Sequence, residues 1–338
     1  MSKLREYGMK MGWIGILVLP IVGGAMGSQT VSRDQRRHAV GSTEELSPLL
    51  QRAFDPGDDF PPIPAPGPND WLAAHAEPGQ SFEQFVGSRP NRPDARRRIL
   101  YLQPLGDFRE GVAPPVDSLR DYAAAYFALE VRVLPKLSLD ERTITTRRNP
   151  ATKNRQLLTT DILAALRKRI PQDAFCLLGI TMEDLYPEPS WNFVFGQASL
   201  RERVGVYSFA RYDPAFYGEP RDRDYAQTLL RRSCKVLVHE TGHMFGLLHC
   251  VWFRCVFNGS NHLAESDGRP LHACPADLRK LHYSIGFDVA GRYAELYRFY
   301  RRAGCDDEAA WTKQRLERIV GVQEAGRLIE AAPRDTKP

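Results

Sequence analysis

The sequence lacks several features that would assign a protein to a broad class at once. The 338 residues contain no internal repeat and no low-complexity tract apart from one proline-rich stretch. Lysine and arginine number 46 against 41 aspartates and glutamates, a mild excess that is scattered rather than striped. No nucleic-acid-binding module is indicated, and we expect no nucleic-acid partner. The chain is long enough to bury a core as one large domain or two, so its function must be sought in local motifs.

No apolar run is long enough for a typical membrane span. The most apolar segment, residues 11–22, follows three basic side chains within residues 3–10 and precedes the small residues of Ala25-Met-Gly27. This order predicts a signal peptide of residues 1–27, export to the periplasm or the extracellular space, and no stable membrane insertion after cleavage. An uncleaved membrane anchor and a mis-assigned start are the alternatives.

Cysteine is scarce and unevenly placed. None of the six cysteines lies in the first 100 residues, so that segment has no thiol that could bind a metal ion and block an active site. Cys176 and Cys234 stand in apolar surroundings and are predicted to be buried core thiols. Three others gather between residues 250 and 274, where an oxidising compartment would favour pairing.

The most informative motif is the HExxHxxGxxH pattern of residues 239–249. His239 and His243 are four apart, so a helix presents both imidazoles on one face to a single metal ion. Glu240 follows the first ligand and suits a general base acting on a zinc-activated water. Gly246 can end the helix in the left-handed conformation, which lets His249 return as the third ligand. Histidines of an ordinary amphipathic helix are the structural alternative, which the glycine and third histidine disfavour.

Thiols immediately downstream suggest a second metal site. Cys250, Cys255, Cys274 and Asp277 form a C-x4-C … C-x2-D pattern, and an aspartate oxygen can join three thiolates on zinc. His272 is an alternative fourth ligand. The absence of a second zinc and a short disulfide between Cys250 and Cys255 are further alternatives.

With these motifs, the chain resembles the archaemetzincins, and among them the vertebrate-type members. The resemblance extends over about residues 49–304 and includes the segments Pro61–Trp71, Trp191–Ser199, Ser208–Tyr212 and Arg269-Pro-Leu. It implies a catalytic zinc on the three histidines, Glu240 as the base and a second zinc on the cysteines. Two positions depart from the family pattern: Asp277 replaces a fourth cysteine, and Phe257 replaces a methionine beneath the zinc site. Phenylalanine keeps that floor apolar but is bulkier and stiffer.

Periodicity predicts a mixed α/β chain. Three buried strands and two crossover helices indicate a mostly parallel sheet, in the segments 98–104, 117–129, 131–135, 160–168 and 174–181. A helix over about residues 225–245 carries the histidine motif, and helices follow from residue 275 and over 289–303. These elements, together with the resemblance, predict a metzincin-like zinc peptidase fold. We expect a proline-rich arm over 28–95, a catalytic domain over 96–304 and a helical tail over 305–338.

Two further strands, beginning near Asn192 and Arg203, predict a hairpin. In metzincins an antiparallel edge strand above the zinc pairs with the substrate backbone. The candidate residues for that edge are Phe195, Gly196, Gln197, Ala198 and Ser199. A hairpin that serves only the core is the alternative.

These features together predict a zinc-dependent metallopeptidase that acts on peptides or proteins. The alternatives are a catalytically weak or inactive zinc-binding protein that uses the same cleft, and an amidase acting on non-peptide substrates. Ligand spacing does not specify what fills the cleft, so substrate preference and oligomeric state are left open.

Overall fold

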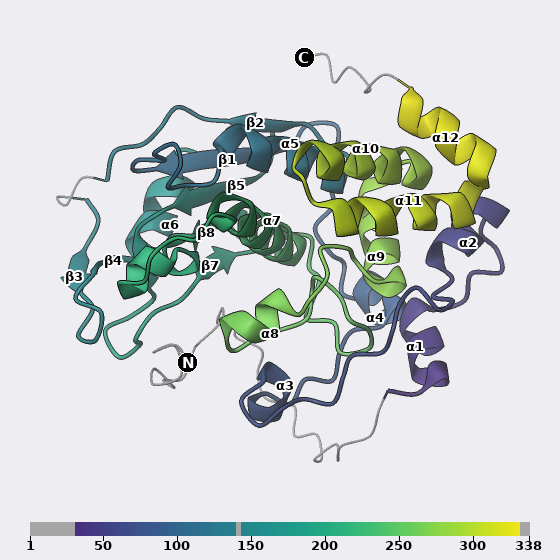
Figure 1. Ribbon diagram of the computed structural model, residues 1–338, viewed down its shortest axis with the longest axis horizontal. Helices are drawn as coiled ribbons and strands as arrows, with labels where there is room; N and C mark the ends of the chain where they lie inside the picture. Colours follow the sequence, from purple (N-terminus) through teal and green to yellow (C-terminus); the bar gives the residue numbers. More distant parts are fainter. Residues whose placement is uncertain (1–30, 140–142, 332–338) are drawn as a thin grey trace.

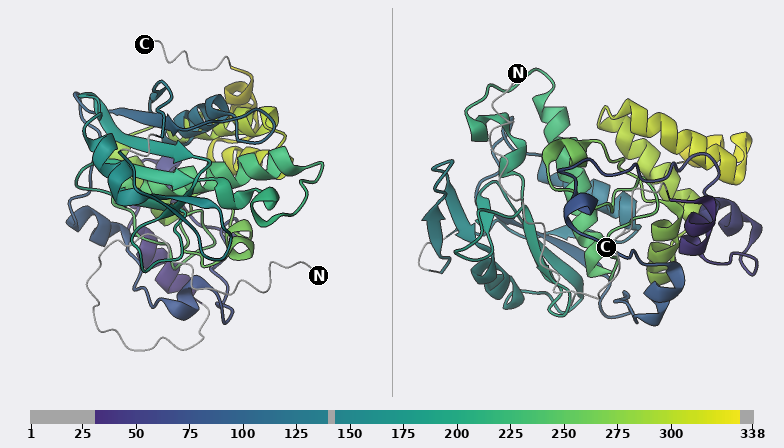
Figure 2. Two further views of the ribbon diagram at one scale, coloured as in Figure 1. Left: turned by 90° about the vertical axis from the view of Figure 1, so that its left-hand side faces the viewer. Right: turned by 90° about the horizontal axis from the view of Figure 1, so that it is seen from below.

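The computed structural model describes residues 31–139 and 143–331. The predicted signal peptide, residues 1–27, therefore lies outside the described residues. Figures 1 and 2 show a twisted sheet on one side of the molecule and a group of helices on the other. Within the described ranges, no helix combines the length and apolar character needed to cross a bilayer.

The main sheet has five strands in the order β2-β1-β5-β8-β7. The first four run parallel, and β7 pairs with β8 antiparallel at the edge. The strands are β1 (Ile99–Leu105), β2 (Val131–Val133), β5 (Ala174–Thr181), β7 (Gly196–Ser199) and β8 (Val204–Ser208). The predicted mostly parallel sheet with an antiparallel edge strand is thus confirmed. The central strand β5 is buried along its whole length, as expected for a strand covered on both faces.

A second, smaller sheet was not anticipated from the sequence. It has the order β3-β4-β6 and is formed by β3 (Thr146–Arg148), β4 (Arg155–Leu158) and β6 (Asp184–Tyr186). The buried Asp184 accepts two hydrogen bonds from Arg211, each 2.8 Å long, and this pair ties β6 to the turn after β8. Strands of three or four residues give too little alternation to be recognised in the sequence.

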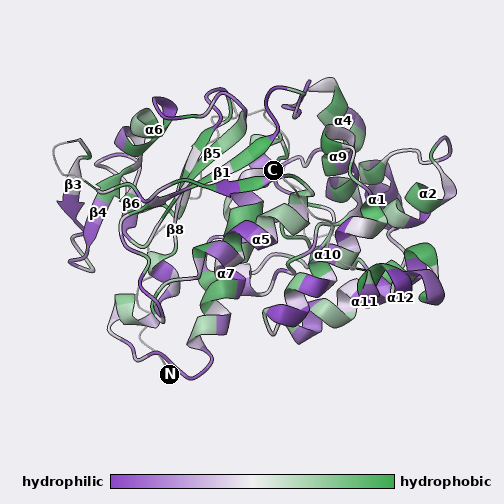
Figure 3. Ribbon diagram, turned by 90° about the horizontal axis from the view of Figure 1, so that it is seen from above, coloured by the Kyte–Doolittle hydropathy of each residue, from purple (hydrophilic) through white to green (hydrophobic). Residues whose placement is uncertain are grey.

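Helices cover the main sheet and connect its strands. The crossover helices are α5 (Val116–Phe127) and α6 (Thr159–Arg167), close to the predicted ranges. The long helix α7 (Tyr225–Met244) contacts β7, β8 and α5. In Figure 3 the central strand β5 is coloured hydrophobic along most of its length, whereas the outer turns of α11 and α12 are hydrophilic. The larger core cluster joins the sheet to α5, α7 and the later helices, and a smaller cluster joins the sheet to α6.

The chain after residue 274 is helical and packs onto the core. Its helices are α9 (Pro275–Ile285), α10 (Val289–Arg302), α11 (Asp306–Val320) and α12 (Val322–Glu330). Leu316, Ile319 and Ala325 are fully buried, so α11 and α12 form a packed layer against α10. The predicted helices are present, and the two in the predicted tail pack on α10.

The N-terminal arm packs on α9 and α11 and also passes beside α8 (Leu263–Asp267), as Figure 1 shows. It contains four short helices, α1 (Arg33–Val40), α2 (Pro48–Phe54), α3 (Trp71–Ala74) and α4 (Phe82–Gly87). Ser32 and Ser81 cap two of them with reciprocal side-chain bonds to a glutamine three residues on. The proline-rich stretch is extended and pairs with the loop at Trp252–Arg254 through Pro62 and Phe253. The division of the chain into arm, domain and tail stays a prediction.

Candidate active site and metal centres

The histidine motif lies where α7 ends. The ring nitrogens Nε2 of His239 and His243 are 3.1 Å apart on one face of the helix. Gly246 follows with φ +88°, a left-handed conformation that glycine adopts without strain, and the chain turns back there. The turn brings His249 to the other two rings, so that one ligand atom from each histidine lies within 4.8 Å of the others. The sequence prediction of three convergent imidazoles is met by the geometry.

Each of the three imidazoles is oriented by a hydrogen bond at its Nδ1. His239 is bonded to the carbonyl of Val256 at 2.8 Å, and His243 to that of Leu247 at 2.7 Å. His249 is bonded to the carboxylate of Glu77 at 2.9 Å. A ring whose Nδ1–H is donated in this way presents its Nε2 lone pair to a metal. Two nitrogens on one tetrahedral zinc are ~3.3 Å apart, so the three histidines fit a zinc ion.

Glu240 lies beside these ligands and is fully buried. Neither of its carboxylate oxygens has a hydrogen-bond partner. Burial raises the pKa of Glu240 well above its usual range, against the opposing charge of Arg269. A buried carboxylate without partners is costly, so its presence here favours a chemical role over a structural one.

Phe257 forms the apolar floor of the histidine site. Its ring is fully buried and its centroid lies 6.1 Å from that of His239. It also packs against α7, because a Cβ added to Gly242 of that helix would lie 2.1 Å from the ring. The bulky residue is therefore accommodated because the helix has no side chain at Gly242.

We expect Gly242→Ala to disrupt the histidine site because the new methyl group and the Phe257 ring cannot occupy the same space. Overpacking of this kind typically costs about 1–3 kcal/mol of unfolding free energy, which urea denaturation would measure. The double variant Gly242→Ala with Phe257→Leu should recover much of the loss. Equal stability of Gly242→Ala and the unmodified protein would contradict this packing.

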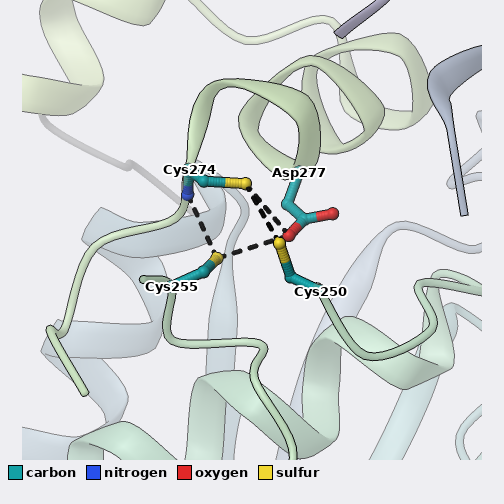
Figure 4. A group of neighbouring side chains, drawn as sticks. All are labelled: Cys250, Cys255, Cys274 and Asp277. Atoms are coloured by element: carbon teal, nitrogen blue, oxygen red, sulfur yellow. Dashed lines mark hydrogen bonds between the residues drawn. The ribbon is translucent and has the colours of Figure 1, made fainter. Parts of the chain in front are cut away.

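The four residues predicted as a second metal site form one buried cluster (Figure 4). The sulfurs of Cys250 and Cys274 are 3.6 Å apart, and Asp277 Oδ2 lies 3.3 Å from the sulfurs of both Cys255 and Cys274. Two thiolates on one tetrahedral zinc are ~3.8 Å apart, so these donors also fit a zinc ion. Although burial alone would raise it, hydrogen bonds from the other two thiols lower the pKa of Cys250.

Asp277 has a buried partner of its own. Lys280, one turn further along α9, donates from Nζ to Asp277 Oδ1 at 2.9 Å, and both side chains are almost fully buried. The carboxylate thus has one oxygen on the ammonium group and the other among the thiols. Burial raises the pKa of Asp277 to about 6, and the charge of Lys280 opposes that shift.

The structure disfavours two of the alternatives for the thiols. All six cysteines are free, so Cys250 and Cys255 form no disulfide. His272 lies outside the cluster, where its ring stacks on Trp311 with centroids 3.6 Å apart. Burial lowers the pKa of His272 to about 3, which suits a neutral packing residue. Of the two candidates for a fourth donor, Asp277 is the one that lies in the cluster.

The two centres share a short segment of chain. His249 and Cys250 are adjacent, so consecutive residues face different centres. Val256, which accepts the hydrogen bond of His239, directly follows Cys255. Arg269 is buried and donates to the Asn258 carbonyl and to Ser260, which holds the end of this loop. The geometry of the cysteine cluster therefore supports the orientation of the first histidine.

The predicted substrate edge lies beside the metal helix. Gly196, Gln197, Ala198 and Ser199 form β7, whereas Phe195 precedes it and is buried against Tyr212. Ala198 pairs with Gly205, and a Cβ added to Gly205 would lie 2.9 Å from Met244, the residue after His243. The edge strand is thus close to the end of α7 that carries the histidines.

Three histidines in HExxHxxGxxH order, with Glu240 beside the first, are the pattern of a class of zinc metallopeptidases. A model described as Peptidase family M54 matches residues 138–283. Archaemetzincin-2 of Rattus norvegicus is 41% identical over 299 residues, covering 80% of this chain and 83% of the relative. The human archaemetzincin-2 is 42% identical over 293 residues, covering 78% and 80%. The chain therefore belongs to the archaemetzincin family.

Among solved structures, archaemetzincin from Methanopyrus kandleri is 31% identical. The match covers 57% of this chain and 97% of that one, with a TM-score of 0.45.

Two residues of the site were missed by reasoning from the sequence. Lys280 stands three residues after Asp277 on the same helix, a spacing that could have marked it as a charge partner. Glu77 gave no such signal because 172 positions separate it from His249. Only the fold brings the arm carboxylate to the third ligand.

Proposed function

We propose that this metallopeptidase hydrolyses peptide bonds with zinc held by His239, His243 and His249 and with Glu240 as the general base. The observation that carries the proposal is the unpartnered, buried carboxylate of Glu240 next to three imidazoles whose Nδ1 atoms are already bonded. A zinc ion at this position supplies Lewis acidity, which lowers the pKa of water and polarises a carbonyl group.

The chain's own residues then move the proton. Glu240 lies beside the first ligand, and neither of its carboxylate oxygens has a hydrogen-bond partner, so the carboxylate is available to accept a proton. It would accept a proton from the attacking water and return it to the leaving amine. Tyr207 and Tyr212 line the buried surroundings of Glu240, where burial raises the pKa of both phenols. Both phenols therefore stay neutral across the physiological pH range.

We infer that the substrate binds in extended form along β7. The edge strand has β8 on one side only, so its outer backbone groups can extend the ladder to a peptide. Asn91 holds β7 near the histidine end of α7. Its amide donates to the carbonyl of Met244, the last residue of α7, and to that of Leu200, in the turn after β7. Export of the protein is a separate proposal that rests on residues 1–27 alone.

The test is zinc-dependent cleavage of a peptide mixture, followed by mass spectrometry. We expect cleavage that stops on removal of zinc with a chelator and returns when zinc is restored. Small non-peptide amides, assayed in parallel, should be poor substrates because they cannot pair along β7. No peptide cleavage by the zinc-loaded protein would overturn the proposal, and preferential hydrolysis of the amides would replace it with the amidase alternative.

A further inference from the structure

The turn that delivers the third histidine is held by the N-terminal arm. The side chain of Gln80 binds this turn twice: its Nε2 donates to the Gly246 carbonyl at 3.2 Å, and its Oε1 accepts from the Leu248 amide at 3.3 Å. Pro90 packs against Gly246 from the same arm. The position of the turn therefore depends on residues more than 150 positions earlier in the chain.

Glu77 lies on the same part of the arm and contacts the ligand itself. Both carboxylate oxygens are near His249 Nδ1, at 2.9 and 3.1 Å. The edge of Trp71 packs on the same imidazole, with ring centroids 5.1 Å apart. Although burial alone would raise it, the hydrogen bond and charge of His249 lower the pKa of Glu77. A carboxylate is thus held on the imidazole nitrogen that the metal does not use.

The three ligands are not oriented in the same way. His239 and His243 belong to α7 and are bonded to neutral backbone carbonyls. His249 lies beyond the end of that helix, and its Nδ1 is bonded to a carboxylate. A loop ligand has more orientations to lose than a helical one, so it gains most from a fixed partner.

We propose that Glu77 is a positioning residue for the catalytic metal site. It fixes the tautomer and ring orientation of His249, and it makes the N-terminal arm a permanent part of the site. An arm carboxylate that instead blocked the metal would have to face the ligand nitrogens. Glu77 is bonded to Nδ1 of His249, so this carboxylate orients the ring and does not itself take the place of the metal. This inference rests on the proposed three-histidine zinc site.

The test compares zinc affinity in Glu77→Ala, Glu77→Gln and two controls, by competition with a chromophoric chelator. Glu110→Gln alters an exposed glutamate, and Asp70→Asn alters an arm residue bonded to His262, outside the three-histidine group. His249→Ala identifies the zinc that belongs to the histidine site. Loss of an orienting carboxylate typically weakens metal binding 10–100-fold.

We expect a loss of about 10–100-fold for Glu77→Ala, a smaller loss for Glu77→Gln, and changes within about twofold for both controls. The amide oxygen of glutamine can still accept from Nδ1–H, so a partial loss is expected there. In NMR spectra of the zinc-loaded protein, the Nδ1–H resonance of His249 should move in both Glu77 variants and stay in place in Asp70→Asn.

Unchanged zinc affinity in Glu77→Ala would overturn the inference. So would an equal loss in Asp70→Asn, since attachment of the arm in general would then explain the effect. If the unmodified protein binds no zinc that His249→Ala removes, the proposed function itself fails, and this outcome is distinct from the other two.

Discussion

Glu240→Gln is expected to abolish nearly all peptide cleavage while the protein keeps its zinc and its fold. The carboxylate is not one of the three convergent ligands, so metal binding should not depend on it. Loss of a general base typically lowers kcat by roughly 10²–10⁴-fold. The zinc-free protein should be as stable as before or more so, because a buried carboxylate without partners is unfavourable.

The measurements are kcat on a cleaved peptide, zinc per chain and urea denaturation. Glu110→Gln is the matched control, since it removes the charge of a glutamate that is exposed. A kcat within about tenfold of the unmodified enzyme, with zinc still bound, would contradict the role of Glu240.

The second large effect is expected at the cysteine cluster. Asp277→Ala removes the fourth donor and also leaves the ammonium group of Lys280 buried without its carboxylate. Breaking a buried ion pair from one side typically costs about 3–5 kcal/mol of unfolding free energy. We also expect the second zinc to be lost and, since Val256 orients His239 from the same loop, the affinity of the histidine site to fall.

Two further variants separate the charge effect from the metal effect. Adding Lys280→Met to Asp277→Ala should recover part of the stability, because no unpaired charge is then buried. It should not recover the zinc, which still lacks its fourth donor. Asp117→Ala removes the carboxylate of an exposed pair with Arg120 at the same helical spacing and should cost under about 1 kcal/mol. Full stability and two zinc ions in Asp277→Ala would contradict the role of Asp277 as a zinc ligand and as the charge partner of Lys280.

The sequence was informative where one segment carries both the residues and their geometry. In HExxHxxGxxH the helix period aligns His239 with His243, and the glycine permits the turn to His249. Strand β5 was recognisable as a nearly continuous apolar run of 8 residues, and the helix α7 from apolar residues at helical spacing. Local patterns of this kind need no knowledge of tertiary contacts.

The remaining features depend on contacts between distant segments. The three-residue strands β3 and β6 are too short to show a period, and they form only because they pair with β4. Glu77 and Gln80 meet the His249 turn across more than 150 residues of chain. The packing of Phe257 against Gly242 likewise depends on how the loop returns to the helix. Such contacts follow from the fold, and no short motif encodes them.

We propose that this chain holds two metal centres, of which the one built from three histidines is catalytic. Zinc per chain, measured by elemental mass spectrometry on the unmodified protein and on His243→Ala, tests it most directly. We expect two zinc ions in the first and one in the second, with peptide cleavage lost together with the missing ion. Equal zinc content in the two proteins, or cleavage that survives in His243→Ala, would contradict it.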